Sequence, residues 1–345
     1  MNHAKPTGQP DTHSKTAREW MKTLIPYRTP NHKRSWFELL ITIIPFAALC
    51  TAAYFALNVS FLLSFPLTVL AAVFLVRLFI IQHDCGHGAF FKNKKLNDWV
   101  GRFIGVFTMA PYDVWRRAHN IHHSASGNLD KRGVGDIDTL TVSEFNALSR
   151  FGKFKYRFYR HPFVLFVIGP IFIFIFHYRL PIGFMSAGPK YWISSMGTNA
   201  AIALFVGLMI YFIGFVPFLL VYVPIVLLAA AMGVWMFYVQ HQFEDAHWDR
   251  QEDWEREEAA LFGSTHYDLP PVLRWLTGNI GIHHVHHLNS RIPFYRLTEV
   301  LRDHPALIEI KRLTFTDSFK CIKLQLWDEK ARKLVSFKQA KLAHA

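Results

Sequence analysis

Charged residues are scarce in this chain of 345 residues: they make up 18% of it, whereas hydrophobic residues make up 51%. In soluble domains about a quarter of the residues are charged. The scarcity therefore argues against two soluble domains, although the length would allow them. Aromatic residues are abundant, with 32 Phe, 12 Tyr and 10 Trp. The composition is typical of a chain with much of its surface facing lipid.

Cysteine is also rare, and the sequence lacks any nucleic-acid-binding motif. Cys50, Cys85 and Cys321 are odd in number and widely spaced, so we expect no disulfide framework and a reducing compartment. The net charge of +13 comes without a zinc finger, a basic helix or an aromatic RNA-binding signature. We therefore expect no nucleic-acid partner and attribute the charge to basic cytoplasmic loops of a membrane protein.

Long apolar runs predict a first membrane hairpin. Residues 39–57 carry no charge, and residues 61–82 carry only Arg77. About 20 such residues cross a bilayer, and the three residues between the runs are enough only for a tight turn. We expect Arg77 to extend its side chain toward the lipid headgroups.

A second hairpin follows from the charge-free stretch 200–240. About 40 residues of helix would be roughly 60 Å long, twice the hydrocarbon thickness. Gly214 and Pro217 offer a break, so we predict spans over residues 199–216 and 218–240. Residues 163–176 are apolar but short. If the histidines around His119 and His241 act together, they lie on one side of the membrane, and an even number of crossings must separate them. The second hairpin already supplies two crossings, so residues 163–176 should form an in-plane or re-entrant helix, bent at Gly169 and Pro170.

The sequence thus predicts an all-α integral membrane protein, with four transmembrane helices in two hairpins, in-plane helices and a cytoplasmic helical cap. Residues 1–36 read as a mobile cytoplasmic tail, because they lack a signal-peptide pattern. Residues 37–302 form the membrane and metal domain, and residues 303–345 a basic cytoplasmic segment. Lys and Arg gather away from the hairpin tips, which predicts that both termini are cytoplasmic. Residues 245–260 resemble an amphipathic helix.

Histidine is unusually frequent, with 19 in the chain, and 11 of them fall into four groups. In chain order these are His83 and His87; His119, His122 and His123; His241 and His247; and His283, His284, His286 and His287. The spacings i, i+3 and i+4 place side chains on one face of a helix. Imidazoles this close would repel one another when protonated and would need partners when buried and neutral, and a bound metal satisfies both requirements.

The number of histidines predicts two metal ions, because eight or nine ligands exceed the four of a structural zinc. Imidazole suits zinc, copper, iron or nickel. Zinc has no redox chemistry, so two ions beside lipid indicate redox metals that activate oxygen. The residues alone do not separate iron from copper.

Segments around these histidines resemble the three histidine boxes of membrane fatty-acid desaturases. The boxes are H-D-C-G-H-G-A-F-F at 83–91, R-R-A-H-N-I-H-H at 116–123 and G-N-I-G-I-H-H-V-H-H-L at 278–288. Further segments, G-D-I at 135–137, Q-H-Q-F-E-D at 240–245, Y-D-L-P at 267–270 and R-I-P at 291–293, are similar to the bacterial acyl-lipid group. That group is similar to plant enzymes that act at the twelfth carbon, and the likeness spans roughly residues 37–302.

The resemblance implies a di-iron desaturase of the bacterial inner membrane, with its metal site in the cytoplasm. It would use O2 as co-substrate and electrons from a separate donor, such as an acidic ferredoxin drawn to the basic face. It would introduce a cis double bond at the ninth or twelfth carbon of an acyl chain in a membrane lipid. The implied iron ligands are His83, His87, His119, His122, His123, His241, His283, His286 and His287.

Other residues near the boxes have weaker claims to a role. We do not expect His284 or His247 to be ligands, and Asn279 is a candidate for assistance through a water molecule. Carboxylates that could orient the imidazoles are Asp84, Asp136 and Glu244. Aromatic residues that could line an acyl tunnel are Trp115 and Phe90.

Three alternative functions follow from the same residues. An acyl hydroxylase or carotenoid ketolase of the same superfamily would share the ligands. An intramembrane metalloprotease would use the spacing of His83 and His87, but Asp84 stands where H-E-x-x-H has glutamate, and the other boxes stay unexplained. A metal carrier or channel would place its ligands within the spans. The position of the double bond, the acyl carrier, the donor and the oligomeric state do not follow from the sequence.

Overall fold

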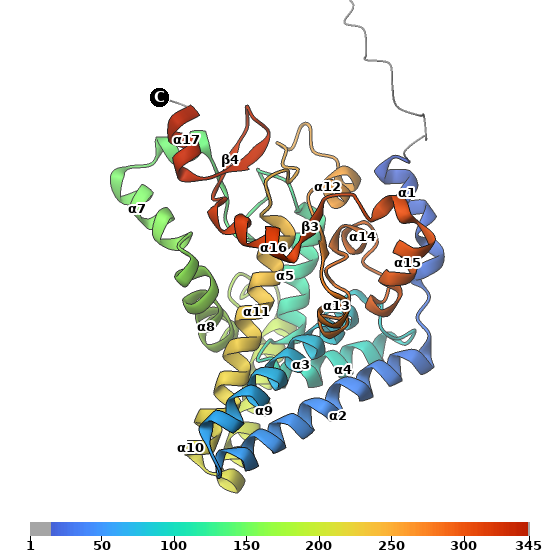
Figure 1. Cartoon of the computed structure of the whole chain (residues 1–345), viewed down its shortest axis with the longest axis vertical. Helices are drawn as coiled ribbons and strands as arrows, with labels where there is room; N and C mark the ends of the chain where they lie inside the picture. The colour runs from blue at the N-terminus through green and yellow to red at the C-terminus, as the bar shows by residue number, and fades with distance from the viewer. Residues whose placement is uncertain (1–14, 344–345) are drawn as a thin grey trace, which may run out of the picture.

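The computed structural model describes residues 15–343, and most of them are helical. Within that range four helices are long and apolar enough to cross a membrane. They are α2 (His32–Leu57), α3 (Phe61–His87), α9 (Pro189–Ile213) and a helix running over Phe215–His241, made of α10 (Phe215–Pro217), η5 (Phe218–Tyr222) and α11 (Val223–His241). Figure 1 shows the ends of these helices gathered at the bottom of the view, with the shorter elements above them. The predicted fold class, with four membrane helices in two hairpins, is confirmed.

The first hairpin turns where the sequence predicted. Ser60 caps the start of α3, and its hydroxyl accepts a hydrogen bond from the backbone N–H of Leu62 at 3.1 Å. Across the hairpin, Ser64 Oγ donates to the carbonyl of Ala53 at 2.8 Å. Both helices extend further than the apolar runs at the end that carries the first histidine box, because Asn31 caps the start of α2 and α3 continues through that box to His87.

Arg77 does not reach the headgroups, and that expectation was wrong. Its side chain is 1% exposed and pairs with the equally buried Glu38 of α2. It also donates to Thr42 Oγ1 at 3.1 Å and to the carbonyl of Trp275. A buried charge needs a partner, and Glu38 lies just before the charge-free run from which the first span was predicted.

The second hairpin breaks at Gly214 alone. Its φ of +89° lies in the left-handed region, which glycine adopts without steric cost. Pro217 was predicted to share the break, but it lies in α10, in the first turn of the next helix. A proline is tolerated there because the missing N–H has no partner in a first turn.

Residues 163–176 lie in the second of two helical parts that meet at a bend. After α7 (Arg150–Tyr159), the chain runs through η2 (Val164–Ile168), α8 (Gly169–Ile171), η3 (Phe172–Phe176) and η4 (His177–Arg179). The two parts meet at 58°, as in a broken span or a re-entrant loop, so the in-plane or re-entrant assignment stays a prediction.

The predicted bend at Gly169 and Pro170 was wrong. These residues lie inside continuous helix, where the π-helical turns on either side accommodate the proline. The break lies instead between Tyr159 and Val164, beside Pro162, because the residue before a proline disfavours helical geometry.

The segment before α2 is folded as far as it is described. It forms α1 (Ala17–Thr23) and η1 (Ile25–Arg28), with Trp20 and Leu24 buried. Tyr27 donates a hydrogen bond to Asp303 at 2.9 Å. The expected mobile tail is therefore wrong for residues 15–36, whose apolar residues recur at helical spacing. Residues 1–14 lie outside the described range.

Short helices and two small sheets form a cap over the end of the membrane helices that carries His87 and His241. The helices are α4 (Lys94–Phe107), α5 (Tyr112–Ala125), α6 (Val142–Ala147), α12 (Arg256–Phe262), α13 (Pro271–Leu276), α14 (His283–Leu288), η6 (Phe294–Arg296), α15 (Leu297–Asp303), η7 (Pro305–Leu307), α16 (Phe315–Ser318), η8 (Phe319–Lys323) and α17 (Phe337–Ala343). The first and last described helices, α1 and α17, lie at this same end (Figure 1).

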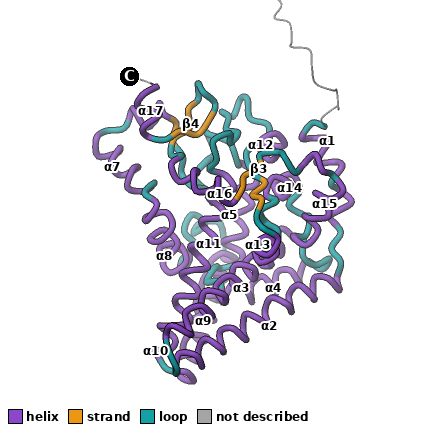
Figure 2. The backbone as a smooth tube through the Cα atoms, in the orientation of Figure 1, coloured by secondary structure: helices purple, strands orange, loops and turns teal. Residues whose placement is uncertain are grey.

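The sheets were not predicted. One has the order β1 (Leu140–Thr141), β4 (Leu326–Asp328), β5 (Lys333–Val335), and the other pairs β2 (His266–Asp268) with β3 (Arg312–Thr314) in parallel. Figure 2 shows the strands confined to the cap. The pairing of β1 with β4 ties the C-terminal segment to the middle of the chain. The division into three parts at residues 36 and 302 stays a prediction.

The predicted amphipathic helix over residues 245–260 is mostly absent. Helix appears only from Arg256, in α12. Before it the chain pairs with the loop after α5: Asp249 N–H donates to the carbonyl of Gly127 at 2.9 Å, and Trp254 Nε1 donates to the carbonyl of Ser126 at 3.0 Å. These tertiary hydrogen bonds override the helical pattern.

Candidate metal centre

The ends of two membrane helices supply three histidines. His83 and His87 lie one turn apart in the last turns of α3, with ring centroids 4.7 Å apart. His241 is the last residue of α11. Because both helices continue beyond the apolar part of their spans, their final turns carry ligands into the cap.

Two short helices of the cap supply the other six. In α5, His119 and His123 lie one turn apart, and His122 lies at i+3. In α14, His283 and His287 lie one turn apart, with His286 at i+3. All six residues of α14 are buried, so this helix enters the centre of the cap with its whole circumference covered.

The nine side chains converge as two groups of potential ligands. Group 1 is His83, His87, His119, His123 and His286, and group 2 is His122, His241, His283 and His287. Within each group the nitrogen atoms lie within 4.8 Å of one another. In both α5 and α14 the i, i+4 pair belongs to one group and the i+3 histidine to the other. Helix α5 therefore contributes two histidines to group 1 and one to group 2, and α14 does the opposite; we call this the exchange of histidines between the two helices. The structure brings together all nine histidines that the sequence predicted as ligands.

The nitrogens of group 2 present lone pairs to one another. His122 Nδ1 donates to Asp136, and His241 Nδ1 lies 3.3 Å from the carbonyl of Gly263. A neutral imidazole has only one N–H, so the Nε2 atoms of His122 and His241, 3.2 Å apart, both carry lone pairs. Such a contact repels unless a cation lies between the two atoms.

The remaining nitrogen distances fit a common ion. His241 Nε2 and His287 Nε2 lie 3.0 and 3.1 Å from His283 Nε2. In group 1, His123 Nε2 lies 3.1 Å from the Nε2 atoms of both His119 and His286. Two nitrogens bound at right angles to an ion at ~2.1 Å are about 3.0 Å apart. The donor set therefore fits two ions with imidazole ligands.

Two ligands of group 1 are otherwise unsatisfied. Among the described residues, the buried Nε2 atoms of His83 and His87 have no hydrogen-bond partner. A buried polar atom without a partner costs about 1–3 kcal/mol. Metal coordination would remove that cost.

Burial keeps the cap histidines neutral, as metal ligands must be. Desolvation, followed by the neighbouring histidines, lowers the pKa of His283, His286 and His287 well below the usual 6.5. The same causes lower the pKa of His119 and His123. Near pH 7 each of these rings can therefore offer a lone pair.

Two of the three predicted carboxylates contact ligand histidines. Asp136 accepts from His122 Nδ1, and Asp84 Oδ1 lies 3.1 Å from His83 Nδ1 while Oδ2 accepts from the N–H of Phe294 at 2.6 Å. Both contacts engage Nδ1 and leave Nε2 available to a metal ion. Glu244 was the wrong candidate, because its exposed side chain pairs with Lys333 at 3.4 Å.

Gly135 explains how Asp136 reaches the site. Its φ is +73°, and a Cβ there would lie 3.0 Å from the carbonyl of Ala118 in α5. Glycine thus lets the loop approach α5 closely, and the next side chain meets His122. The acceptor for His241, the carbonyl of Gly263, was missed, because a backbone carbonyl leaves no signal in the sequence.

The remaining candidates lie outside the two groups. His284 Nε2 contacts the carbonyl of Leu307 at 2.9 Å, and His247 pairs with Asp249 at 2.6 Å. Asn279 donates to the carbonyl of Phe294 at 3.1 Å. Each of these three side chains therefore has a partner outside the two groups.

The two aromatic candidates for a tunnel differ in position. Trp115 stacks on His119, with ring centroids 4.8 Å apart, so it contacts group 1. Phe90 packs against the rings of Phe91 and Phe294. A tunnel lined by both residues stays a prediction.

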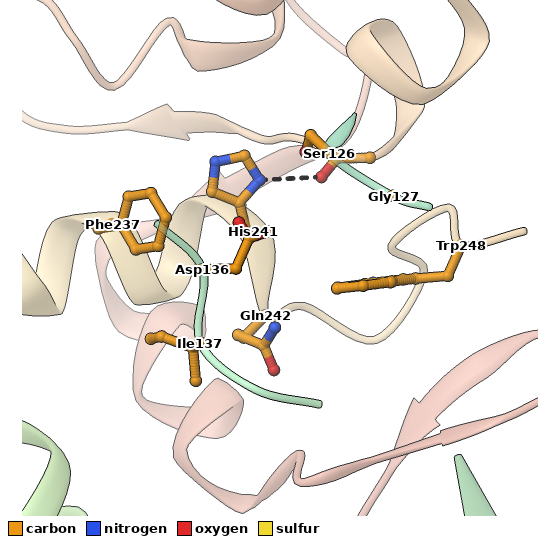
Figure 3. Close-up of a pocket in the computed structure, with 9 residues that line it drawn as sticks. Ser126, Gly127, Asp136, Ile137, Phe237, His241, Gln242 and Trp248 are labelled. Carbon is orange, nitrogen blue, oxygen red and sulfur yellow. Dashed lines mark hydrogen bonds between the residues drawn. The ribbon is translucent and has the colours of Figure 1, made fainter. Parts of the chain in front are cut away.

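A cavity of about 10 Å³ lies beside group 2, lined by His241, Asp136, Gln242 and Trp248 among others (Figure 3). This volume holds about one water molecule. The dashed line in Figure 3 marks the contact of the His241 ring with the carbonyl of Gly263. Group 2 is thus enclosed, with room for one small molecule at its edge.

The chain matches a known family and several curated proteins. A family model described as "Fatty acid desaturase" matches residues 60–319. A fatty acid desaturase of Bacillus subtilis (strain 168) is 44% identical over 320 residues, which cover 93% of this chain and 90% of that protein.

More distant relatives have more specific names. An sn-1 acyl-lipid omega-3 desaturase (ferredoxin) of Synechocystis is 30% identical over 254 residues, covering 68% of this chain and 66% of that protein. An sn-1 oleoyl-lipid 12-desaturase of Anabaena variabilis is 26% identical over 290 residues, covering 77% and 75%. These matches agree with the resemblance carried by the three histidine boxes.

Proposed function

The chain belongs to the fatty acid desaturase family, and from this premise we propose that it is a di-iron desaturase of membrane-lipid acyl chains. The proposed reaction takes one hydrogen from each of two adjacent methylenes and leaves a cis double bond. O2, two electrons and two protons complete the balance, and two water molecules form. The double bond is proposed at the ninth or twelfth carbon.

The observation that carries the proposal is the pair of histidine groups at the ends of membrane helices. Five and four imidazoles would each hold one iron, and the bound irons would supply the oxidation of unactivated C–H bonds. The chain's own part is to hold the rings neutral and oriented, through Asp136, Asp84 and the carbonyl of Gly263. Burial of group 2 excludes bulk water from that side.

Several partners and the location of the enzyme are part of the same proposal. Electrons would come from a separate carrier of the ferredoxin kind. In support, one relative is named as a ferredoxin-dependent acyl-lipid desaturase, and the chain's net charge of +13 would attract an acidic donor. We propose that the metal centre and both termini face the cytoplasm of a bacterial inner membrane, because Lys and Arg gather at that end.

The test is a fatty-acid profile of a bacterium that lacks polyunsaturated lipids and expresses this chain together with a ferredoxin. Gas chromatography with mass spectrometry should reveal an acyl species two mass units lighter than its precursor. The same cells with His122→Ala should lack it. A hydroxylated product would favour the hydroxylase of the same superfamily, and an unchanged profile would refute the proposed reaction.

A further inference from the structure

A cleft of about 650 Å³ opens beside group 1. Its lining includes His87 at the end of α3, residues of α4 and α5, and the first residues of α9. Pockets that bind small molecules have volumes of about 300–1,000 Å³. The cleft is therefore large enough for a polar headgroup and touches a proposed iron ligand.

The charge of the lining is strongly positive. Its cationic residues are Lys92, Lys94, Arg116, Arg117, Lys190 and Arg291, and its carboxylates are Asp98 and Asp113. Six positive charges minus two negative charges leave an excess of four. Like charges gathered in one cleft repel one another, and an anionic ligand relieves that repulsion.

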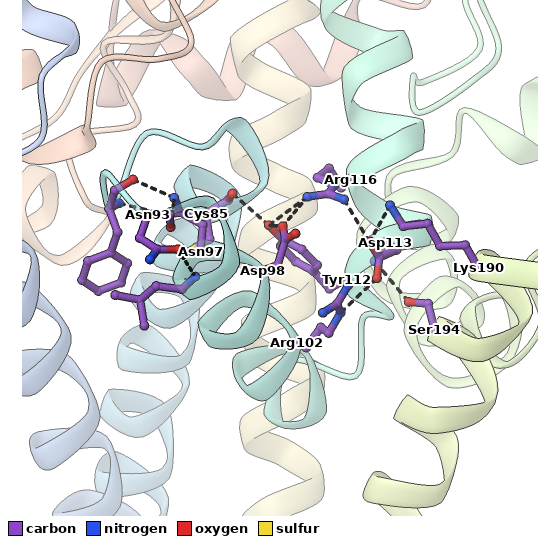
Figure 4. A network of polar contacts seen from close by, with 12 residues as sticks. Cys85, Asn93, Asn97, Asp98, Arg102, Tyr112, Asp113, Arg116, Lys190 and Ser194 are labelled. Carbon is purple, nitrogen blue, oxygen red and sulfur yellow. Dashed lines mark hydrogen bonds and ion pairs between the residues drawn. The ribbon is translucent and has the colours of Figure 1, made fainter.

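The two carboxylates are already engaged, as Figure 4 shows. Asp113, whose side chain is only 3% exposed, pairs with Arg116 at 2.9 Å and with Arg102 and Lys190 at 3.1 Å. Asp98 accepts from Arg116 and from the hydroxyl of Tyr112. These contacts hold Arg116 and Lys190 in place and neutralise the carboxylates, so they do not balance the other cations.

Four cations of the lining lack an ionic partner among residues 15–343: Lys92, Lys94, Arg117 and Arg291. Arg117 is oriented by a hydrogen bond to the hydroxyl of Tyr191 at 2.7 Å and lies over the rings of Tyr191 and Phe184. Guanidinium groups match the oxygens of a phosphate with two parallel hydrogen bonds. The chemistry of the cleft thus suits a phosphate.

The position of the cleft favours a lipid over a soluble ligand. It is bordered by the end of α3 and the start of α9, two helices that can cross the membrane. Helix α4, which lines the cleft, also exposes Trp99, at 68%, and Phe103, at 55%, and exposed aromatic residues are typical of the level of lipid headgroups. A lipid could therefore enter the cleft sideways from the bilayer.

We infer that this cleft binds the phosphate-bearing headgroup of the acyl lipid whose chain is desaturated. The inference rests on the proposed function and adds the class of its substrate, a glycerophospholipid, and the residues that recognise it. Arg117 and Arg291 contact the phosphate, and the headgroup is held beside His87. The cleft therefore selects the lipid by its charge, whereas the acyl chain is selected elsewhere.

The experiment measures lipid binding to the full-length, iron-loaded protein in detergent micelles. The probes are phosphatidylglycerol and diacylglycerol with identical saturated chains. The test variant is Arg117→Gln/Arg291→Gln. The control variant, Lys155→Gln/Lys338→Gln, removes the same charge from α7 and α17, outside the cleft.

We expect the test variant to bind phosphatidylglycerol about tenfold more weakly or worse, because two charge-assisted hydrogen-bonding groups are lost. The control variant should bind it as the unmodified protein does, and diacylglycerol should bind weakly to all three. Unchanged phosphatidylglycerol binding by the test variant would overturn the inference. So would diacylglycerol binding as tight as that of the phospholipid.

Two further arms separate other occupants. Inorganic phosphate that displaces the phospholipid at equal concentration would assign the cleft to free phosphate and overturn the inference. A test variant that keeps lipid binding but loses the rate supported by reduced ferredoxin would assign it to the electron donor, with the same consequence.

Binding needs no turnover, so the two proposals can fail separately. Arginine-dependent phospholipid binding without any desaturated product would refute the reaction but leave the headgroup site standing. A desaturated product together with phospholipid binding that is unchanged in the double-arginine variant would support the reaction but refute the headgroup site.

Discussion

The two histidine groups lie side by side, yet they differ in enclosure. All four members of group 2 are buried, whereas His87, His119 and His123 of group 1 are partly exposed. Group 1 borders the basic cleft, while group 2 borders a cavity of about 10 Å³. If each group holds one of the proposed ions, a substrate can approach the ion of group 1, whereas the protein encloses the ion of group 2.

The largest expected effect comes from removing one ligand from each group in turn. His122 and His123 are neighbours in α5 but belong to different groups, so His122→Ala and His123→Ala form a matched pair. We expect each variant to lose one of two irons per chain and all activity, while the membrane helices still insert. Iron content measured against protein concentration, together with product analysis, tests this. Two irons and normal activity in either variant would contradict the assignment of that ligand.

Acidification should lower the stability of the protein, because histidines of the enclosed group 2 are buried and neutral. The pKa values of His283 and His287, the two members of group 2 that lie in α14, are lowered by burial, so below pH 6.5 the unfolded chain binds protons that the folded chain does not. Stability is then complete above pH 6.5 and falls as the pH drops, with a slope that approaches about 1.4 kcal/mol per histidine per pH unit. The Tm of the metal-free protein should decrease steadily from pH 7 to pH 5.5. A flat profile would mean that these rings are not buried and neutral.

A smaller effect is expected from the carboxylate that orients group 2. Asp136→Asn removes the anionic acceptor at His122 Nδ1 and should reduce iron affinity or activity by about 10–100-fold. Glu244→Gln is the matched control, because Glu244 forms an exposed pair with Lys333, and such pairs contribute about 0–1 kcal/mol. Iron titration of both variants measures the difference. Equal affinities would show that Asp136 does not support the ligand.

The smallest expected effect concerns the histidine of α14 that belongs to neither group. Burial lowers the pKa of His284 to about 3, and its ring contacts the carbonyl of Leu307. His284→Gln should retain both irons and lose about 1–3 kcal/mol of stability, the usual cost of disturbing a buried hydrogen bond. Thermal unfolding and iron content decide this, and complete loss of iron would make His284 a ligand.

The spans and the convergence of the nine histidines were predictable because their signals are local. A charge-free run of 20 residues has few structures open to it in a bilayer, and histidines at i and i+4 share a helix face whatever surrounds them. The exchange of His122 and His286 between the groups was not predictable. It depends on how α5 and α14 face each other, and helix periodicity carries no information on that.

The failures have a common physical cause in distant partners. Arg77 was expected to reach the headgroups because its partner, Glu38, is 39 residues away. Residues 245–260 have a helical pattern, but hydrogen bonds to the loop at residues 126–129 hold most of them in a non-helical conformation. The sequence predicts a mobile tail over residues 1–36, but in its described part Tyr27 contacts Asp303. In each case a long-range contact overrode a correct local pattern.

The exchange of histidines between α5 and α14 also determines when each group can be completed during synthesis of the chain. Each group includes a residue of α14, so neither can be complete before residue 286 or 287 has been synthesised. At about 5–20 residues per second, His87 waits roughly 10–40 seconds for its last companion. During that interval the two hairpins can already be in the membrane, with incomplete sets of ligands. Maturation of the centre is therefore a late event, and an ion captured early by α3 and α5 alone would be held by four histidines at most.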